Sequence, residues 1–332
     1  MKIETISLII ASSLFLGPCG WTDSSAASFL KIQPSARNFA LGGDNPALSF
    51  GAQAVGANPA NMVIQPKPFE LTTTFASTIG GGAYGHLCGD WKDGSRAFGV
   101  HVTSLRSASL VGRDADGNVT SNFTGQDLSA GISYAEKLNS HLRVGITGKA
   151  VKETIGTYDS NVVPAADVGA SLVMGKALVS AGVSNLGGKL IFAGGQGSKL
   201  PEHYDLGAAY ELGDLMLVAG AGKWANEGTT YADMGLEFRL GPIALRAGYR
   251  GDTGKNLALS SQNTQNQALA GVTGGIGIKR ENWRVDYAVG QSAAEYQWSQ
   301  RVSLTVAWGG SSAAKKPTVS SGVRKSGKSW VR

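Results

Sequence analysis

The sequence has few charged residues, few prolines and two cysteines, and these shortages exclude several classes of protein. Charged residues make up 16% of the 332 residues, and 10 prolines stand against 47 glycines. Glycine lowers helix propensity by about 1 kcal/mol per site relative to alanine. Here it occurs without a collagen-like period and beside ample aliphatic residues, which argues against a helical bundle and against disorder.

A long apolar run is also missing. No stretch of about 18 apolar residues occurs, which excludes a membrane-spanning helix. At the N-terminus Lys2 precedes an apolar stretch over 6–17, which is too short to cross a bilayer core of ~30 Å and is typical of an export signal. Small residues at Ser25 and Ala27 predict cleavage before Ser28, so that 1–27 is a signal peptide. The alternative is lipoprotein processing at Cys19, although the preceding residue is a proline.

Cysteine and charge add two further exclusions. Removal of Cys19 with the signal leaves Cys88 alone, so no intramolecular disulfide is expected. The net charge of +6 equals the charge of the six basic residues of 309–332, a segment without acidic residues, so the net charge of 1–308 is zero. A neutral body gives no electrostatic support for nucleic-acid binding. The segment 309–332 is rich in Gly, Ser and Lys and is predicted to be a disordered basic tail, for which we hypothesise contact with anionic headgroups or cell-wall polymer.

Alternation of apolar and polar residues runs through most of the sequence after residue 68. Within Trp298–Trp308, Val302 and Leu304 fall in one phase, while Arg301 and Ser303 fall in the other. Because successive residues of a strand point to opposite faces, such a segment has one apolar and one polar side. The same rhythm predicts fourteen strands, at 69–78, 82–91, 96–105, 126–136, 141–154, 162–174, 177–186, 202–212, 214–224, 229–240, 242–251, 267–279, 282–291 and 296–308.

A soluble β-sandwich would alternate in the same way, but three features favour an all-β, transmembrane antiparallel barrel over 69–308. The segments have the length of tilted spanning strands. The polar phase mixes charges of both signs with small residues, as in a hydrated lumen. The third feature is a set of tryptophans near strand ends, as in interfacial girdles: Trp91, Trp224, Trp283, Trp298 and Trp308. Closure into a barrel would pair the backbone groups of every strand edge, as hydrocarbon requires. We therefore expect this chain to lie in the outer membrane of a Gram-negative-type envelope.

The segment 28–68 does not alternate, and its five prolines exclude a continuous strand or helix. Its motif residues are Ser35, Ala36, Arg37, Gly42, Gly43, Asn58, Pro59 and Ala60. These short motifs, and the run Val183–Gly187 followed by Leu200-Pro201, resemble the PorV/PorQ family, a branch of the FadL-like outer-membrane barrels. The resemblance covers about 29–308, although Phe50-Gly51 replaces an acidic pair usual in the family.

The resemblance implies a barrel of fourteen strands whose N-terminal segment forms a hatch in the lumen. It also implies two functions. We favour an accessory role in protein secretion or surface assembly of the type IX kind, with secretion machinery or a cargo protein as partner. The alternative is a FadL-like transporter of hydrophobic small molecules. A third class, an outer-membrane hydrolase, is kept open by the chance of a wall-mounted Ser-His pair.

Signs of catalytic chemistry are few, and we expect neither an enzyme nor a cofactor. The histidines His86, His101, His141 and His203 lie on different predicted strands without metal-type spacing and are interpreted as structural. The run 114–118 is interpreted as a polar turn, with a calcium loop as the alternative.

Charged residues of the polar phase are the candidate site residues of the lumen. They form either a stiffening ionic network or the lining of a passage for an amphipathic or anionic ligand. These candidates are Arg143, Asp205, Glu211, Glu237, Arg239, Arg246, Arg250, Arg284, Asp286 and Arg301.

Overall fold

The computed structural model describes the chain except for residues 1–24, 79–80, 115, 254–270, 292–297 and 310–332. Most of the expected signal peptide, including Cys19, and the basic tail therefore lie outside the described residues. No helix among the described residues is long and apolar enough to cross a membrane.

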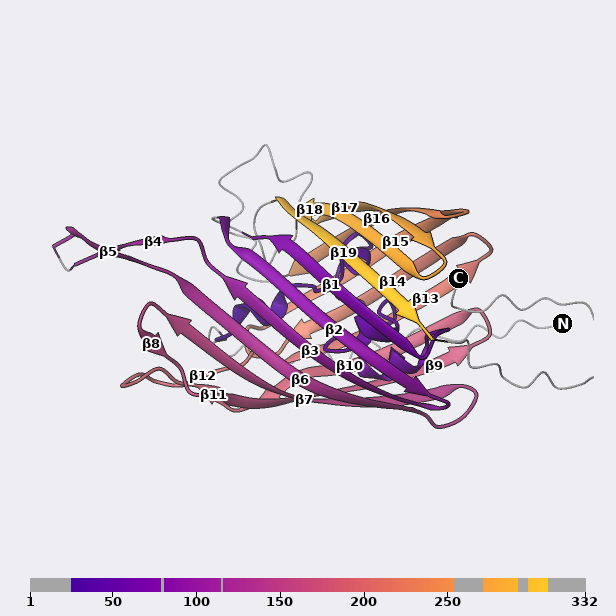
Figure 1. Ribbon diagram of the computed structural model, residues 1–332, viewed down its shortest axis with the longest axis horizontal. Helices are drawn as coiled ribbons and strands as arrows, with labels where there is room; N and C mark the ends of the chain where they lie inside the picture. The colour runs from indigo at the N-terminus through magenta and orange to yellow at the C-terminus, as the bar shows by residue number, and fades with distance from the viewer. Residues whose placement is uncertain (1–24, 79–80, 115, 254–270, 292–297, 310–332) are drawn as a thin grey trace, which may run out of the picture.

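Fourteen antiparallel strands close into a barrel within the described part of the chain, which confirms the predicted fold (Figure 1). Each strand pairs with its neighbour in sequence, and the last strand pairs with the first, from Phe69↔Trp308 to Ala76↔Arg301. Within the described residues the observed bounds differ from the predicted ones by a few residues, and 267–270 and 296–297 of the predicted strands lie outside those residues. The strands are β1 Phe69–Ser77, β2 Ala83–Asp93, β3 Arg96–Arg106, β6 Gly125–Lys137, β7 Leu142–Ile155, β9 Val163–Met174, β10 Ala177–Gly187, β13 His203–Leu212, β14 Leu215–Trp224, β15 Thr229–Leu240, β16 Ile243–Thr253, β17 Val272–Arg280, β18 Trp283–Gln291 and β19 Trp298–Trp308.

The apolar phase of these strands faces outward. Ile132 in the middle of β6 is 70% exposed, and Phe75 and Met234 are also exposed. One end of the barrel carries the tight turns, such as the one between Leu240 and Ile243, and we call it the tight-turn end. At this end the ring of Phe69 stacks on Trp308 with centroids 5.9 Å apart. Such a surface is suited to lipid, with aromatic rings at its border.

Trp224 does not belong to this outer belt, and that prediction was wrong. It is 5% exposed and stacks inside the barrel on His203, with ring centroids 4.0 Å apart. Trp224 shares its strand phase with Met216 and Val218, which also point inward. A position near a strand end does not determine the face of a residue, because the phase of the strand decides it.

The opposite end of the barrel, which carries the longer connections, contains short strands that were not predicted. A hairpin of β4 (Leu110–Arg113) and β5 (Val119–Phe123) projects beyond the wall (Figure 1). Short strands also occur at β8 (Tyr158–Asp159), β11 (Lys189–Leu190) and β12 (Ser198–Lys199). The predicted strands do not include these segments, because short strands in stretches rich in Ser, Gly and Asn do not show a clear alternation of apolar and polar residues.

The tip of the β4–β5 hairpin is a polar turn. The carboxylate of Asp114 accepts hydrogen bonds from the backbone N–H groups of Asp116 and Asn118 and from the Asn118 amide. This Asx-type bonding is sufficient to explain the polar composition of the turn.

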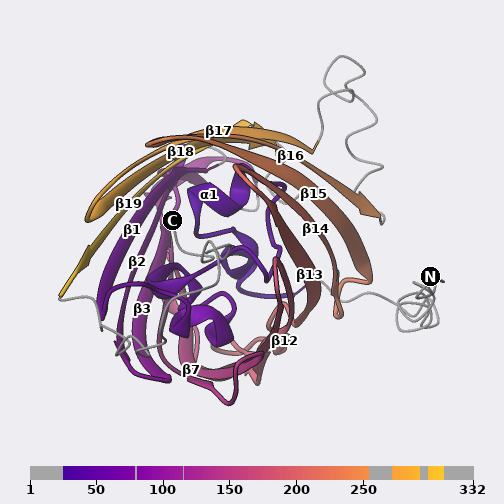
Figure 2. The same cartoon turned by 90° about the vertical axis from the view of Figure 1, so that its right-hand side faces the viewer.

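The N-terminal segment lies inside the ring of strands (Figure 2). It forms four short helices: η1 (Ser28–Lys31), α1 (Ala36–Phe39), η2 (Gly51–Ala54) and η3 (Pro59–Val63). Helix α1 contacts β17, β18 and β19, whereas η3 contacts β6, β7 and β9, so the segment crosses the lumen. We call residues 28–68 the hatch segment.

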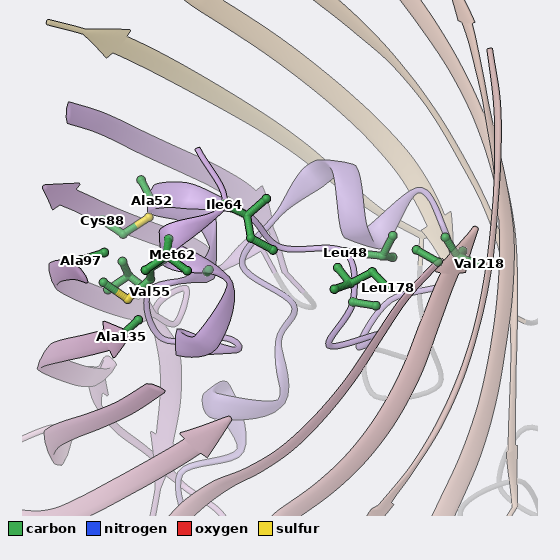
Figure 3. Close-up of a cluster of buried hydrophobic side chains, with 14 of the residues drawn as sticks. Leu48, Ala52, Val55, Met62, Ile64, Cys88, Ala97, Ala135, Leu178 and Val218 are labelled. Atoms are coloured by element: carbon green, nitrogen blue, oxygen red, sulfur yellow. The ribbon is translucent and has the colours of Figure 1, made fainter. Parts of the chain in front are cut away.

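Apolar side chains attach the hatch segment to the wall. Val55 and Met62 pack with small wall residues such as Cys88 and Ala97, and Leu48 packs near Leu178 on the opposite side (Figure 3). The inner wall is therefore partly apolar where the hatch segment touches it.

Wall glycines allow the backbone of the hatch segment to come close. A Cβ added at Gly145 would lie 2.5 Å from the carbonyl carbon of Pro59, and one at Gly248 would lie 2.3 Å from the nitrogen of Gly42. No side chain fits at such distances, so part of the high glycine content serves this close contact.

Candidate functional site in the barrel lumen

Two Asn-Pro-Ala turns shape the middle of the hatch segment. In the second turn, the side-chain oxygen of Asn58 accepts a hydrogen bond from the Ala60 N–H at 3.2 Å. In the first turn, Asn45 accepts from the Ala47 N–H at 3.0 Å. The side-chain amides of Asn58 and Asn61 both donate to the carbonyl of Pro46, which joins the two turns. Sequence reasoning missed the first turn, although the repeated tripeptide signals it.

The other motif residues lie at the start of the hatch segment. The hydroxyl of Ser35 accepts from the Asn38 N–H and caps α1, and the N–H of Ala36 donates to the hydroxyl of Ser303 in β19 at 3.0 Å. Gly42 and Gly43 have φ values of 103° and 117°, which only glycine adopts without strain. These contacts fix the path of the chain between α1 and the first Asn-Pro-Ala turn.

Arg37 connects the hatch segment to a carboxylate of the wall. Its guanidinium donates to both oxygens of Glu237 in β15, at 2.8 and 3.2 Å, and to the carbonyl of Leu48 at 2.8 Å. Burial alone would lower the pKa of Arg37, but the charge of Glu237 and its hydrogen bonds outweigh this effect and raise the pKa. Arg37 therefore stays charged in a site from which water is almost excluded.

Most of the predicted lumen charges extend from Glu237 into one ionic network. Glu237 also binds Arg239 at 2.9 Å and Arg246 at 2.7 Å. Arg246 in turn contacts Asp286 at 2.8 Å. The network is completed by the pairs Arg239–Glu211 and Arg284–Asp286. These residues lie near the tight-turn end of the barrel, and Arg37 belongs to the same network through its pair with Glu237.

The remaining predicted residues lie outside this network. Arg250 pairs with Asp44 of the hatch segment and with Asp252, and it covers the ring of Tyr231 at 3.9 Å. Arg301 covers the ring of Phe39 at 3.8 Å.

Arg143 and Asp205 are placed separately from these pairs. Arg143 is half-buried at the start of β7, where it donates to the carbonyl of His141 at 3.4 Å. Asp205 lies 3.9 Å from the Nδ1 atom of His203 on another part of the wall. The ten candidates therefore form one network and several separate contacts.

A buried lysine site was missed by sequence reasoning. The ammonium group of Lys149 contacts Asp167 at 2.7 Å and the side-chain oxygen of Asn185 at 2.6 Å. Asn185 adopts a φ of 62° at a bulge in β10, from which its amide also donates to the carbonyl of Pro201. Lys149 shares the polar phase of β7 with Arg143, and this signal could have found it.

A cavity of about 80 Å³ lies between the hatch segment and two facing parts of the wall. Its apolar side includes Phe29, Leu30 and Trp224. Its polar lining includes the histidines of β2, β3 and β13, together with Lys149 and Asp205. His86, His101 and His203 thus share one cavity, although their sequence positions gave no such grouping. Over the described ranges, no three His, Cys, Asp or Glu side chains are arranged to hold a metal ion.

Comparison with known proteins gives matches by structure. No protein-family model matches the chain, and no curated protein matches it. The toluene transporter TodX of Pseudomonas putida matches with a TM-score of 0.61 and 14% identity, over 84% of this chain and 99% of that chain. The monoaromatic hydrocarbon channel CymD matches with a TM-score of 0.60 and 14% identity, over 85% and 99%. A FadL homologue of Pseudomonas aeruginosa matches with a TM-score of 0.51 and 11% identity, over 86% and 98%. At these identities the likeness establishes the shared barrel fold.

Proposed function

We propose that this chain is an outer-membrane barrel that passes small hydrophobic molecules across the outer membrane. The observation that carries the proposal is the combination of the barrel fold with the hatch segment inside its lumen. A closed barrel of the kind found in toluene transporters holds a hatch segment, and a small cavity with an apolar side lies between this segment and the wall. The apolar outer face supports a place in the membrane. The structures to which the chain is similar are described as channels and transporters rather than as enzymes.

The comparisons favour this transporter hypothesis over the secretion hypothesis, for which they provide no support. A PorV-like role in secretion stays a prediction, and co-purification with a translocon or a cargo protein from native membranes would test it. The hatch function of residues 28–68 belongs to the present proposal. In this proposal the ionic network around Glu237 keeps the lumen closed, and the cavity holds the molecule in transit.

Uptake by whole cells tests the function, because the lipopolysaccharide leaflet slows the entry of hydrophobic molecules. The chain is expressed in a Gram-negative host that lacks its own FadL-type transporter, and the initial rate of uptake of labelled toluene is measured. We expect faster uptake than in cells with the empty vector. Equal rates, with the barrel present in the outer membrane, would overturn the proposal.

A variant pair tests whether the cavity lies on the route. Ser129 lines the cavity, and Ser129→Trp would fill it. Ser140 lies exposed in the turn between β6 and β7, so Ser140→Trp adds the same ring outside the lumen. We expect the first substitution to slow toluene uptake severalfold and the second to leave it unchanged.

A further inference from the structure

Three polar side chains form a recess on one side of the lumen cavity. His86, His101 and Ser129 belong to the adjacent strands β2, β3 and β6, and all three line the cavity. The two imidazole rings lie face to face with centroids 5.9 Å apart. The Nδ1 atom of His86 is hydrogen-bonded to the hydroxyl of Thr103 at 2.7 Å, which fixes the orientation of the ring.

Each of these side chains has a buried polar atom without a partner. Within the described chain, no residue forms a hydrogen bond with Nε2 of His86, Nδ1 of His101 or the hydroxyl of Ser129. All three residues are more than nine-tenths buried. Because an unsatisfied buried polar group costs free energy, three of them at one cavity indicate a place where a hydrogen-bonding group binds.

The charges around the recess select a neutral group. Among the described residues, Lys149 is the only lysine or arginine that lines the cavity, and its ammonium group is already bound by Asp167 and Asn185, so it is not available to an anion. Burial away from water disfavours a charged ligand group that has no partner of opposite charge. Imidazole and hydroxyl groups both donate and accept, and they suit a ligand group that does the same.

We propose that this recess binds the hydroxyl group of a small, neutral, otherwise hydrophobic molecule, so that the preferred substrate is phenol-like rather than a plain hydrocarbon. This inference rests on the proposed transport function and names its substrate class. The apolar part of the ligand points toward Phe29 and Leu30. The cavity of about 80 Å³ is smaller than the ~150 Å³ that accommodate benzene, so these two side chains move when a ring enters.

Phenol and toluene are suitable probes, because they have nearly the same size and differ in a hydroxyl against a methyl group. Their affinities for the purified full-length protein in detergent are measured by titration calorimetry. The ratio of the two affinities is then compared between the wild type and the His86→Leu/His101→Leu variant. We expect the ratio of phenol to toluene affinity to fall about tenfold or more in the variant, as for the loss of two hydrogen bonds. Toluene binding should persist, which also shows that the variant is folded.

Control variants and further ligands sharpen the test. His141→Leu removes an exposed histidine from the turn before β7 and should leave the ratio unchanged. Ser129→Ala is a smaller change, which should be tolerated even if the two leucines disturb assembly. It should lower the affinity for phenol and leave the affinity for toluene unchanged. An unchanged ratio in both recess variants means that the recess holds only water, and it overturns the inference while the transport function stands. Tighter binding of benzoate or benzylammonium than of phenol overturns it as well. Absence of binding by both phenol and toluene overturns the inference together with the proposed function.

Discussion

Replacing Arg37 by methionine tests whether the ionic network holds the hatch segment in place. Breaking a buried ion pair costs about 3–5 kcal/mol when the partner charge is left alone. Here Glu237 keeps Arg239 and Arg246, so we expect a smaller loss of about 2 kcal/mol in the free energy that keeps the hatch segment closed. This loss corresponds to an opening that is ~30-fold more frequent.

Hydrogen exchange of peptides from 28–68, followed by mass spectrometry, measures this opening directly. We expect protection in these peptides to fall ~30-fold in Arg37→Met while strand peptides keep theirs. Planar-bilayer recordings should show a matching rise in open-channel events. Arg37→Lys keeps the charge but loses the bidentate geometry, so its protection in these peptides should lie between that of the wild type and that of Arg37→Met.

Arg96→Met is the matched control. Arg96 is exposed and pairs with Glu136 at 3.3 Å outside the lumen, and such surface pairs contribute only about 0–1 kcal/mol. Hatch peptides in this variant should exchange like those of the wild type. If Arg37→Met also exchanged like the wild type, the ion pairs of Arg37 would not hold the hatch segment in place.

Three further predictions follow from packing and from the lipid-facing wall. Gly145→Val should displace η3 and raise exchange in 55–68, because the added side chain meets the backbone of the hatch segment, whereas Gly148→Val in the same strand meets nothing within 4 Å and should have no effect. Ile132→Arg should lower barrel stability in lipid by about 2–4 kcal/mol, as measured by denaturant titration, against about 0–1 kcal/mol for Leu138→Arg at the turn; equal losses would contradict a membrane position for β6. Asn58→Ala should lower the free energy that keeps the hatch segment closed by about 1 kcal/mol, because the hydrogen bond from the Ala60 N–H is lost, and hydrogen exchange of hatch peptides measures this loss.

The local pattern of apolar and polar residues is enough to predict the wall of this protein. Alternation in segments such as Trp298–Trp308 is a local property, because lipid on one side and a polar lumen on the other act on every second residue. The fourteen strands and their approximate bounds follow from it. The prolines of 28–68 likewise excluded this segment from the wall.

Which inward residues meet depends on how the barrel closes around the hatch segment. Arg37 and Glu237 are 200 positions apart and come together through barrel closure and the path of the hatch segment. The same closure brings His203 to the cavity that His86 and His101 line. The two-residue rhythm assigns a face to each residue but no partner, since partners depend on strand register and on what fills the lumen. For that reason the wall could be predicted from the sequence, whereas the network and the cavity could not.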